Sequence, residues 1–204
     1  MTDYSKARRH LMRRDPVLRD LIKRIGPCEL HNAGPRDPFV ALTLSIASQQ
    51  LSTKAADTIF GRFCDLFPPT RVPSAASVLT LTDDQIRAVG FSRPKVGFIK
   101  DLAARVHDGR LDLAGMHAHT DEDVMTQLVA VKGIGRWTAE IFLMFRLLRP
   151  DVLPADDLGL MNAVHRTYRL RKRPTPEKVR KMGEAWRPYR SVASWYLWQS
   201  LSVR

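Results

Sequence analysis

The stretch that decides the fold is LVAVKGIGRWTAEIFLMF, residues 128–145, in which two glycines bracket one isoleucine between two runs of helical periodicity. Gly133 can adopt a positive φ and end the first helix, while Gly135 lets the backbone approach another molecule closely. The next helix begins at once, so its first amide N–H groups point outward without intrahelical partners. The sequence therefore predicts two helices joined by a short turn.

This turn has two interpretations. Its outward N–H groups and the partial positive charge of a helix N-terminus make an anion site, to which the flanking Lys132 and Arg136 add charge. Ile134 is expected to fill the space between the two helices. The alternative is a tight connection between helices that binds no ligand. The Gly-x-Gly spacing alone does not separate the two.

The charge balance favours an acidic partner. The 204 residues include 33 Lys and Arg against 21 Asp and Glu, a net charge of +12 with a sequence pI near 10.3. Such an excess points first to DNA or RNA, and otherwise to solubility alone or an acidic membrane surface. The 2 cysteines cannot form a four-cysteine zinc or iron–sulfur site. No apolar run has the length of a signal peptide or a membrane span, which predicts a soluble, intracellular protein.

Most of the remaining sequence shows helical periodicity, and no convincing alternation of period two predicts a strand. The pattern gives about ten helices and an all-α fold. An Asp15-Pro16 pair is expected to break the first helical segment, and residues 68–75 and 111–120 are expected to be irregular. The expected helical segments are 4–24, 37–50, 52–67, 82–109 with a turn at Gly90, 121–131, 157–170, 176–186 and 190–201.

Four segments together resemble one known family. The pattern L-x-x-V-x-G-I-G-x-x-T-A at 128–139 resembles the hairpin of the helix-hairpin-helix (HhH-GPD) DNA glycosylase superfamily, and RPDVLPADDLGL at 149–160 resembles the loop and aspartate that follow it. SIASQQLSTKAA at 45–56 resembles the segment that these enzymes place against DNA. RPYRSVASWYLW at 187–198 resembles the C-terminal signature of the 3-methyladenine DNA glycosylase II branch. The segments occur in the family's order.

The resemblance implies a two-lobed helical fold without an N-terminal β domain. We expect basic N-terminal helices at 1–36 that pack on the core, a helical lobe at 37–110, and the hairpin and catalytic lobe at 111–204; the whole chain, 1–204, also reads as one domain. The implied activity is that of a monofunctional glycosylase that flips alkylated bases of the 3-methyladenine type out of double-stranded DNA and excises them hydrolytically, leaving an abasic site. A monomer without a membrane partner is expected, in the cytoplasm or nucleoid of a bacterium or the nucleus of a eukaryote.

By matching motif positions, Asp157 is the catalytic acid and Asp156 the expected cap of the following helix. The reaction passes through an oxocarbenium-like transition state, which a carboxylate stabilises directly or by orienting a water. A purine alkylated at N3 or N7 already carries positive charge and leaves without protonation, so one carboxylate suffices. The plain alternative is that both aspartates only cap a helix and complement its dipole.

Trp137 stands where the bifunctional relatives carry a nucleophilic lysine, so the resemblance implies hydrolysis without strand cleavage. It also places Trp137 and Trp198 in the base pocket, where an indole stacked on a cationic base gains roughly 0.5–2 kcal/mol. Either tryptophan could instead be a core aromatic. The sequence departs from the family at Lys132, where proline is common, and at Ile141 and Gln199, where aromatics are expected.

The resemblance also implies the DNA contacts, which are Lys132, Gly133, Ile134, Gly135 and Arg136 in the turn, and Gln50, Leu51 and Ser52 in the earlier segment. Either Gln50 or Leu51 is the wedge that fills the space of the flipped base. No cofactor is expected for catalysis. A structural Na⁺ or K⁺ is expected at the hairpin, held by the backbone carbonyls of Val129, Val131 and Ile134.

Three other functions fit parts of the sequence. A helix-hairpin-helix protein could bind DNA without catalysis. A glycosylase for uracil or a mismatched thymine would need a donor for a neutral leaving base, and the sequence shows no clear one. A basic RNA-binding protein fits the charge, but no RNA-module signature appears.

Overall fold

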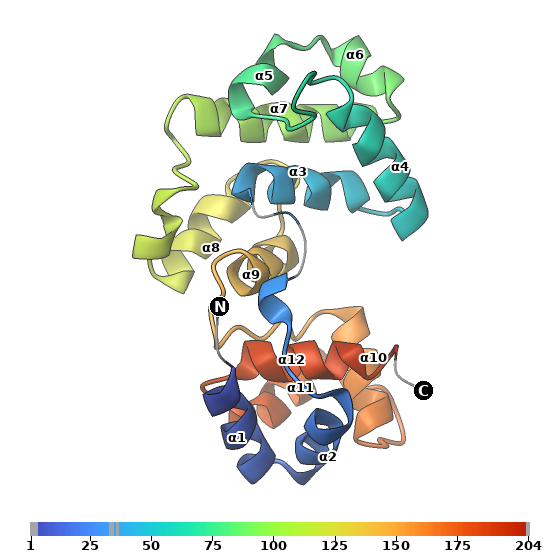
Figure 1. The fold of residues 1–204 in the computed structure, drawn as a ribbon, viewed down its shortest axis with the longest axis vertical. Coiled ribbons are helices and arrows are strands. Elements are labelled where there is room, and N and C mark those ends of the chain that lie inside the picture. The colour runs from blue at the N-terminus through green and yellow to red at the C-terminus, as the bar shows by residue number, and fades with distance from the viewer. Residues whose placement is uncertain (1–3, 33–34, 36, 203–204) are drawn as a thin grey trace. The chain divides into compact units, whose positions relative to one another are not determined.

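The computed structural model describes residues 4–32, 35 and 37–202. Residues 1–33 and 143–204 form one compact unit, called here the terminal unit, and residues 34–142 form the central unit. Among the described residues every regular element is a helix and none is a strand. Figure 1 shows these helices in chain order by colour. The all-α prediction is therefore confirmed.

The terminal unit is built around α12, Arg190–Gln199, which is buried from Ser191 to Leu197. Helices α1, α2 and α10 contact it. A helix that is buried on all sides serves as the core of its unit. The other elements of this unit are α1 Ser5–Arg14, α2 Pro16–Ile25, η1 Leu30–Asn32, α10 Leu158–Thr167, α11 Pro176–Gly183 and η3 Glu184–Trp186.

Asp15 joins the N-terminal helices to this core. It ends α1 and caps α2, where its Oδ1 accepts from the amides of Val17 at 2.9 Å and Leu18 at 3.1 Å. Its Oδ2 accepts from the Tyr168 hydroxyl at 2.5 Å and from Trp186 Nε1 at 3.1 Å. A buried carboxylate is tolerated when its oxygens are satisfied in this way. The predicted break at Asp15-Pro16 is confirmed.

The central unit is organised around its longest helix, α7, Arg93–His107. Helix α7 contacts α3, α5 and α6, and Figure 1 draws α5 and α6 on one side of it and α3 on the other. The hairpin helix α9, Arg136–Phe145, starts in the central unit and ends in the terminal unit. The other elements are α3 Pro38–Ser48, α4 Thr53–Cys64, α5 Ala75–Thr80, α6 Asp83–Ala88, η2 Gly115–Ala118 and α8 Asp121–Val129.

Two features differ from the sequence-based expectations. Helix α5 was not predicted, and it follows a Pro-rich stretch that reads as a loop; Ser74 and Ser77 start it by capping each other's backbone amides. The two units also group the residues differently from the expected division at 36/37 and 110/111, because 1–33 packs with the C-terminal helices and 111–142 packs with 37–110. The division into domains stays a prediction.

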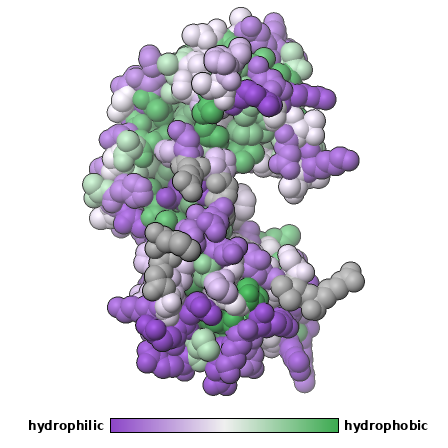
Figure 2. Space-filling model, in the orientation of Figure 1, coloured by the Kyte–Doolittle hydropathy of each residue, from purple (hydrophilic) through white to green (hydrophobic). Residues whose placement is uncertain are grey.

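Figure 2 shows one face of the molecule, on which hydrophilic side chains cover most of the terminal unit and patches of hydrophobic ones appear on the central unit. Within the part of the chain that the structure describes, no helix combines the length and apolar character needed to cross a bilayer.

Candidate functional site

The Gly-x-Gly turn connects α8 to α9 as predicted. Gly133 has φ +80°, and a Cβ built on it would overlap the ring of Phe98. Only glycine fits there, both for the backbone conformation and for the space. Ile134 is 3% exposed and its amide donates to the carbonyl of Val131 at 3.1 Å. Ile134 therefore packs inward, as the sequence predicted.

The outer side of this turn is open. Gly135 is exposed, and a Cβ built on it would meet no atom within 4 Å. Lys132 is also exposed, whereas the exposed Arg136 donates to the buried Glu140 carboxylate one helical turn later, at 3.0 Å. The first amides of α9 begin at Arg136 and, as at any helix N-terminus, have no intrahelical acceptor. The arrangement has the features of an anion site, with the charge of Arg136 partly balanced by Glu140.

The segment from Gln49 to Ser52, called here the 49–52 loop, connects α3 to α4. Gln50 has φ +59°, and the side chain of Leu51 is 40% exposed. Ser52 caps α4 by accepting from the amide of Ala55 at 3.3 Å. Gln50 is exposed as well, so both wedge candidates lie at the surface.

Asp157 is the N-cap of α10. Its Oδ1 accepts from the amide of Leu160 at 2.5 Å and from Trp198 Nε1 at 2.9 Å. The expectation that Asp156 would be the cap is wrong, because the carboxylate of Asp156 is exposed and pairs with Arg180 at 2.6 Å. The carboxylate of Asp157 thus has a fixed orientation, and Asp156 takes no part in capping α10.

Trp198 lies beside this carboxylate on α12. Its ring stacks on Phe145, with centroids 6.0 Å apart and planes at 26°. A Cβ built on Gly159 would lie 3.0 Å from Oδ1 of Asp157 and 3.5 Å from Nε1 of Trp198, so glycine leaves room for their contact. The geometry gives Trp198 a hydrogen-bonding role toward the acid, which sequence reasoning missed. Its predicted part in a base pocket stays a prediction.

Helix α12 also holds the loop that leads to the acid. The Ser191 hydroxyl donates to the carbonyl of Arg149 at 2.6 Å and accepts from the amide of Val152 at 2.9 Å. Arg190 Nε donates to Asp151 at 2.8 Å. One helix therefore fixes the loop at its N-terminal end and the carboxylate, through Trp198, two turns later. The sequence signature at 187–198 marked this helix but not these contacts.

Trp137 lies in the first turn of α9 and is 46% exposed. This exposure does not fit a core aromatic, in contrast to the buried Trp195 and Tyr196 on α12. A large, exposed aromatic next to the hairpin is available to stack on a ligand. Its predicted role as a pocket wall stays a prediction.

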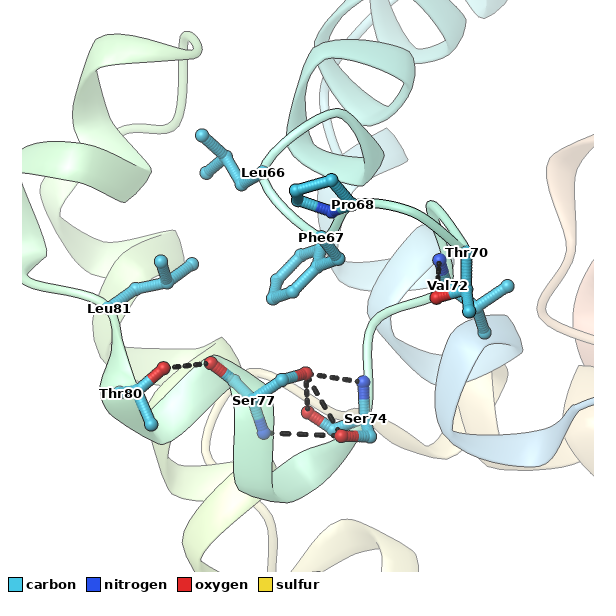
Figure 3. Close-up of a pocket in the computed structure, with 9 residues that line it drawn as sticks. All are labelled: Leu66, Phe67, Pro68, Thr70, Val72, Ser74, Ser77, Thr80 and Leu81. Carbon is cyan, nitrogen blue, oxygen red and sulfur yellow. Dashed lines mark hydrogen bonds between the residues drawn. The ribbon is translucent and has the colours of Figure 1, made fainter.

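Figure 3 shows a surface pocket of the central unit that does not qualify as a reaction site. No titratable side chain lines it, and the hydroxyls of Ser74 and Ser77 bond to each other at 2.9 Å. A reaction site needs polar groups that are available to a substrate. The residues that line this pocket are Leu66, Phe67, Pro68, Thr70, Val72, Ser74, Ser77, Thr80 and Leu81.

Residues 44–188 match a known family, described as HhH-GPD superfamily base excision DNA repair protein. The chain belongs to this superfamily. The matched range contains the 49–52 loop, the hairpin turn and Asp157, and it ends before Trp198. The family membership that was expected from the hairpin is therefore confirmed, and with it the DNA glycosylase fold.

Several HhH-GPD relatives are similar over nearly the whole chain. DNA-3-methyladenine glycosylase 1 of Schizosaccharomyces pombe is 35% identical over 202 residues, which cover 98% of this chain and 89% of the relative. The solved structure of the 3-methyladenine DNA glycosylase Mag1 of S. pombe, in complex with abasic DNA, has a TM-score of 0.87 at 34% identity and 98% coverage of both chains. A DNA-3-methyladenine glycosidase structure from Bacillus halodurans has a TM-score of 0.86 at 34% identity, with 98% of this chain and 91% of that one covered.

Proposed function

We propose that this protein is a monofunctional DNA glycosylase that flips alkylated bases of the 3-methyladenine type out of double-stranded DNA, excises them by hydrolysing the N-glycosidic bond, and leaves abasic sites. The observation that carries the proposal is the Asp157 carboxylate, held by Trp198 and the amide of Leu160 in a chain of the HhH-GPD superfamily. Relatives named DNA-3-methyladenine glycosylase, and one solved with abasic DNA, support the class of substrate.

In this mechanism Asp157 stabilises the sugar as the base leaves. Positive charge develops on the deoxyribose as the glycosidic bond breaks, and a fixed carboxylate of opposite charge lowers the energy of that state. The two N–H donors to Oδ1 hold the carboxylate in one orientation before the substrate arrives. The carboxylate therefore does not need to reorient during the reaction.

The leaving base needs no general acid if it is already cationic. An alkylated purine departs as a neutral molecule, so a site with one carboxylate can act on it. The exposed ring of Trp137 would stack on such a base, and the attraction between a cation and an indole favours the damaged base over a normal one. Trp137 has no amine, and hydrolysis without strand cleavage is therefore proposed.

The hairpin turn would bind a DNA phosphate through its first α9 amides, with Lys132 and Arg136 beside them. The carbonyls of Val129, Val131 and Ile134 suit a structural Na⁺ or K⁺, because oxygen atoms are the donors that these ions prefer. The carbonyl of Val131 accepts one hydrogen bond, from Ile134, and keeps a second lone pair. The ion would neutralise carbonyl dipoles near the phosphate. We also propose that the protein is a monomer and that it acts in the bacterial nucleoid or the eukaryotic nucleus.

The test is to incubate the protein with methylated duplex DNA and to separate the released bases by chromatography. We expect free 3-methyladenine, abasic sites that mild alkali cleaves, and no covalent adduct after borohydride treatment. A borohydride-trapped adduct would contradict the monofunctional mechanism. If no base is released while the duplex is bound, the protein is a DNA-binding protein without this catalysis.

Replacing Trp198 by phenylalanine tests the hydrogen bond to the acid. Trp198→Phe keeps an aromatic ring against Phe145 but removes the Nε1 donor to Asp157. A hydrogen bond to a charged group contributes about 1.5–3 kcal/mol, so single-turnover base release should slow by about 10- to 100-fold. Affinity for an uncleavable duplex should be unchanged. An unaltered rate would show that the indole N–H does not position the carboxylate.

A further inference from the structure

Lys95 at the start of α7 reaches the end of α3. Its Nζ donates to the carbonyl of Ala47 at 2.8 Å and to the carbonyl of Gln49 at 2.6 Å. These carbonyls lie at a helix C-terminus, where backbone oxygens lack intrahelical donors and carry partial negative charge. The Lys95 amine is part-buried, and burial lowers its pKa from the ordinary value. The ammonium group thus anchors the first residue of the 49–52 loop.

Gln49 continues this connection to the hairpin turn. Its side-chain Nε2 donates to the carbonyl of Gly133 at 2.7 Å. Gly133 is the positive-φ residue of the turn, so the bond reaches the point at which the chain reverses toward α9. The 49–52 loop and the hairpin, 84 residues apart in sequence, are therefore joined directly.

Two further residues on the same side of α7, Phe98 and Asp101, contact the hairpin turn. Phe98 packs against Gly133, one turn after Lys95. Asp101 accepts from the amide of Lys132 at 2.9 Å and is held by Arg105 at 2.9 Å. Residues spaced by three or four share one side of a helix. One side of α7 thus contacts both segments that the proposed function brings to DNA.

We propose that Lys95 and Gln49 are positioning residues that couple phosphate binding at the hairpin to insertion of the 49–52 loop into the duplex. The proposal rests on the proposed function. Flipping a base out of the duplex is unfavourable, and a filler that is already ordered offsets more of this cost than a mobile one. With the loop fixed to the turn, Gln50 or Leu51 enters the duplex whenever the turn binds its phosphate.

The experiment compares excision of the same alkylated base opposite its normal partner and opposite an abasic analogue. Lys95→Met and Gln49→Met remove the donors, and Lys95→Arg restores a cationic donor. Lys100→Met is the matched control, because Lys100 lies on the same helix but pairs with Asp83 at 2.5 Å. The two donor-less variants should lose about tenfold or more in single-turnover rate on the paired base. The loss should shrink to within about threefold on the unpaired base, which costs little to flip.

We expect Lys95→Arg to recover part of the single-turnover rate on the paired base. Lys100→Met should keep a rate within about twofold of wild type. Equal losses on paired and unpaired bases, or no loss in either donor-less variant, would overturn the coupling. If Lys95→Met does not fold, Gln49→Met decides the question alone. A fluorescent base analogue at the target position reports flipping without base release. Wild-type protein that flips this analogue but releases no alkylated base contradicts the proposed function while leaving the coupling testable.

Discussion

Asp157→Asn is expected to release alkylated bases about a thousandfold more slowly than wild type and to bind duplex DNA with nearly unchanged affinity. Asparagine keeps an oxygen that accepts from the Leu160 amide and from Trp198, so the N-cap and the local fold are retained. The negative charge is lost, and an NH₂ group replaces the second carboxylate oxygen. Losing one preorganised electrostatic contact to a transition state typically costs about 10²–10³ in rate, and here the lost group is a full charge. Single-turnover release with enzyme in excess measures the effect, and an uncleavable duplex measures the affinity.

The neighbouring aspartate provides the control. Asp156→Asn removes an exposed ion pair with Arg180, and such pairs contribute about 0–1 kcal/mol. Its base release should stay within about twofold of wild type, because Asp157 rather than Asp156 caps α10 and accepts from Trp198. A large loss in Asp156→Asn with a small one in Asp157→Asn would reverse the assignment of the acid.

Much of the helical fold was predictable because the signals are local. Asp15 before a proline, Ser52 before α4 and Thr120 before α8 all cap the helices that follow them. Such caps act within three residues, so they can be recognised in a sequence without knowledge of the fold. Helix α5 was missed because its cap is a pair of serines in a Pro-rich stretch, and composition there favours a loop.

The long-range contacts of the candidate site could not be predicted from such local signals. Asp156 and Asp157 are the same residue type at adjacent positions, and either could cap α10. Trp198, which lies 41 residues from Asp157, contacts the second of them. Gln49 reads as the polar end of an apolar helix, and its bond to Gly133 depends on how α3 packs beside the hairpin. Tertiary packing decides such choices, and local propensity contains no trace of it.

Replacing Gly133 by alanine is expected to destabilise the protein and to abolish DNA binding at the hairpin. The residue has φ +80°, which an alanine adopts only at a cost in free energy, and the Cβ of the alanine would overlap the ring of Phe98. We expect a loss of about 2–4 kcal/mol in the free energy of unfolding, since strain and overpacking add. Thermal or urea unfolding measures the loss, and titration with a fluorescent duplex measures the binding.

Gly135→Ala separates the effect on DNA from the effect on folding. A Cβ at this position meets no atom within 4 Å and the backbone φ is not positive, so the free energy of unfolding should change by less than about 0.5 kcal/mol. If the turn binds a phosphate through the first amides of α9, the added methyl group is expected to hinder its close approach. Losing a hydrogen bond to a charged group corresponds to about a 10- to 100-fold weaker affinity. If Gly135→Ala left the affinity of the protein for the duplex unchanged, the turn would be only a connection between two helices. The spacing of the glycines alone could not reject that interpretation.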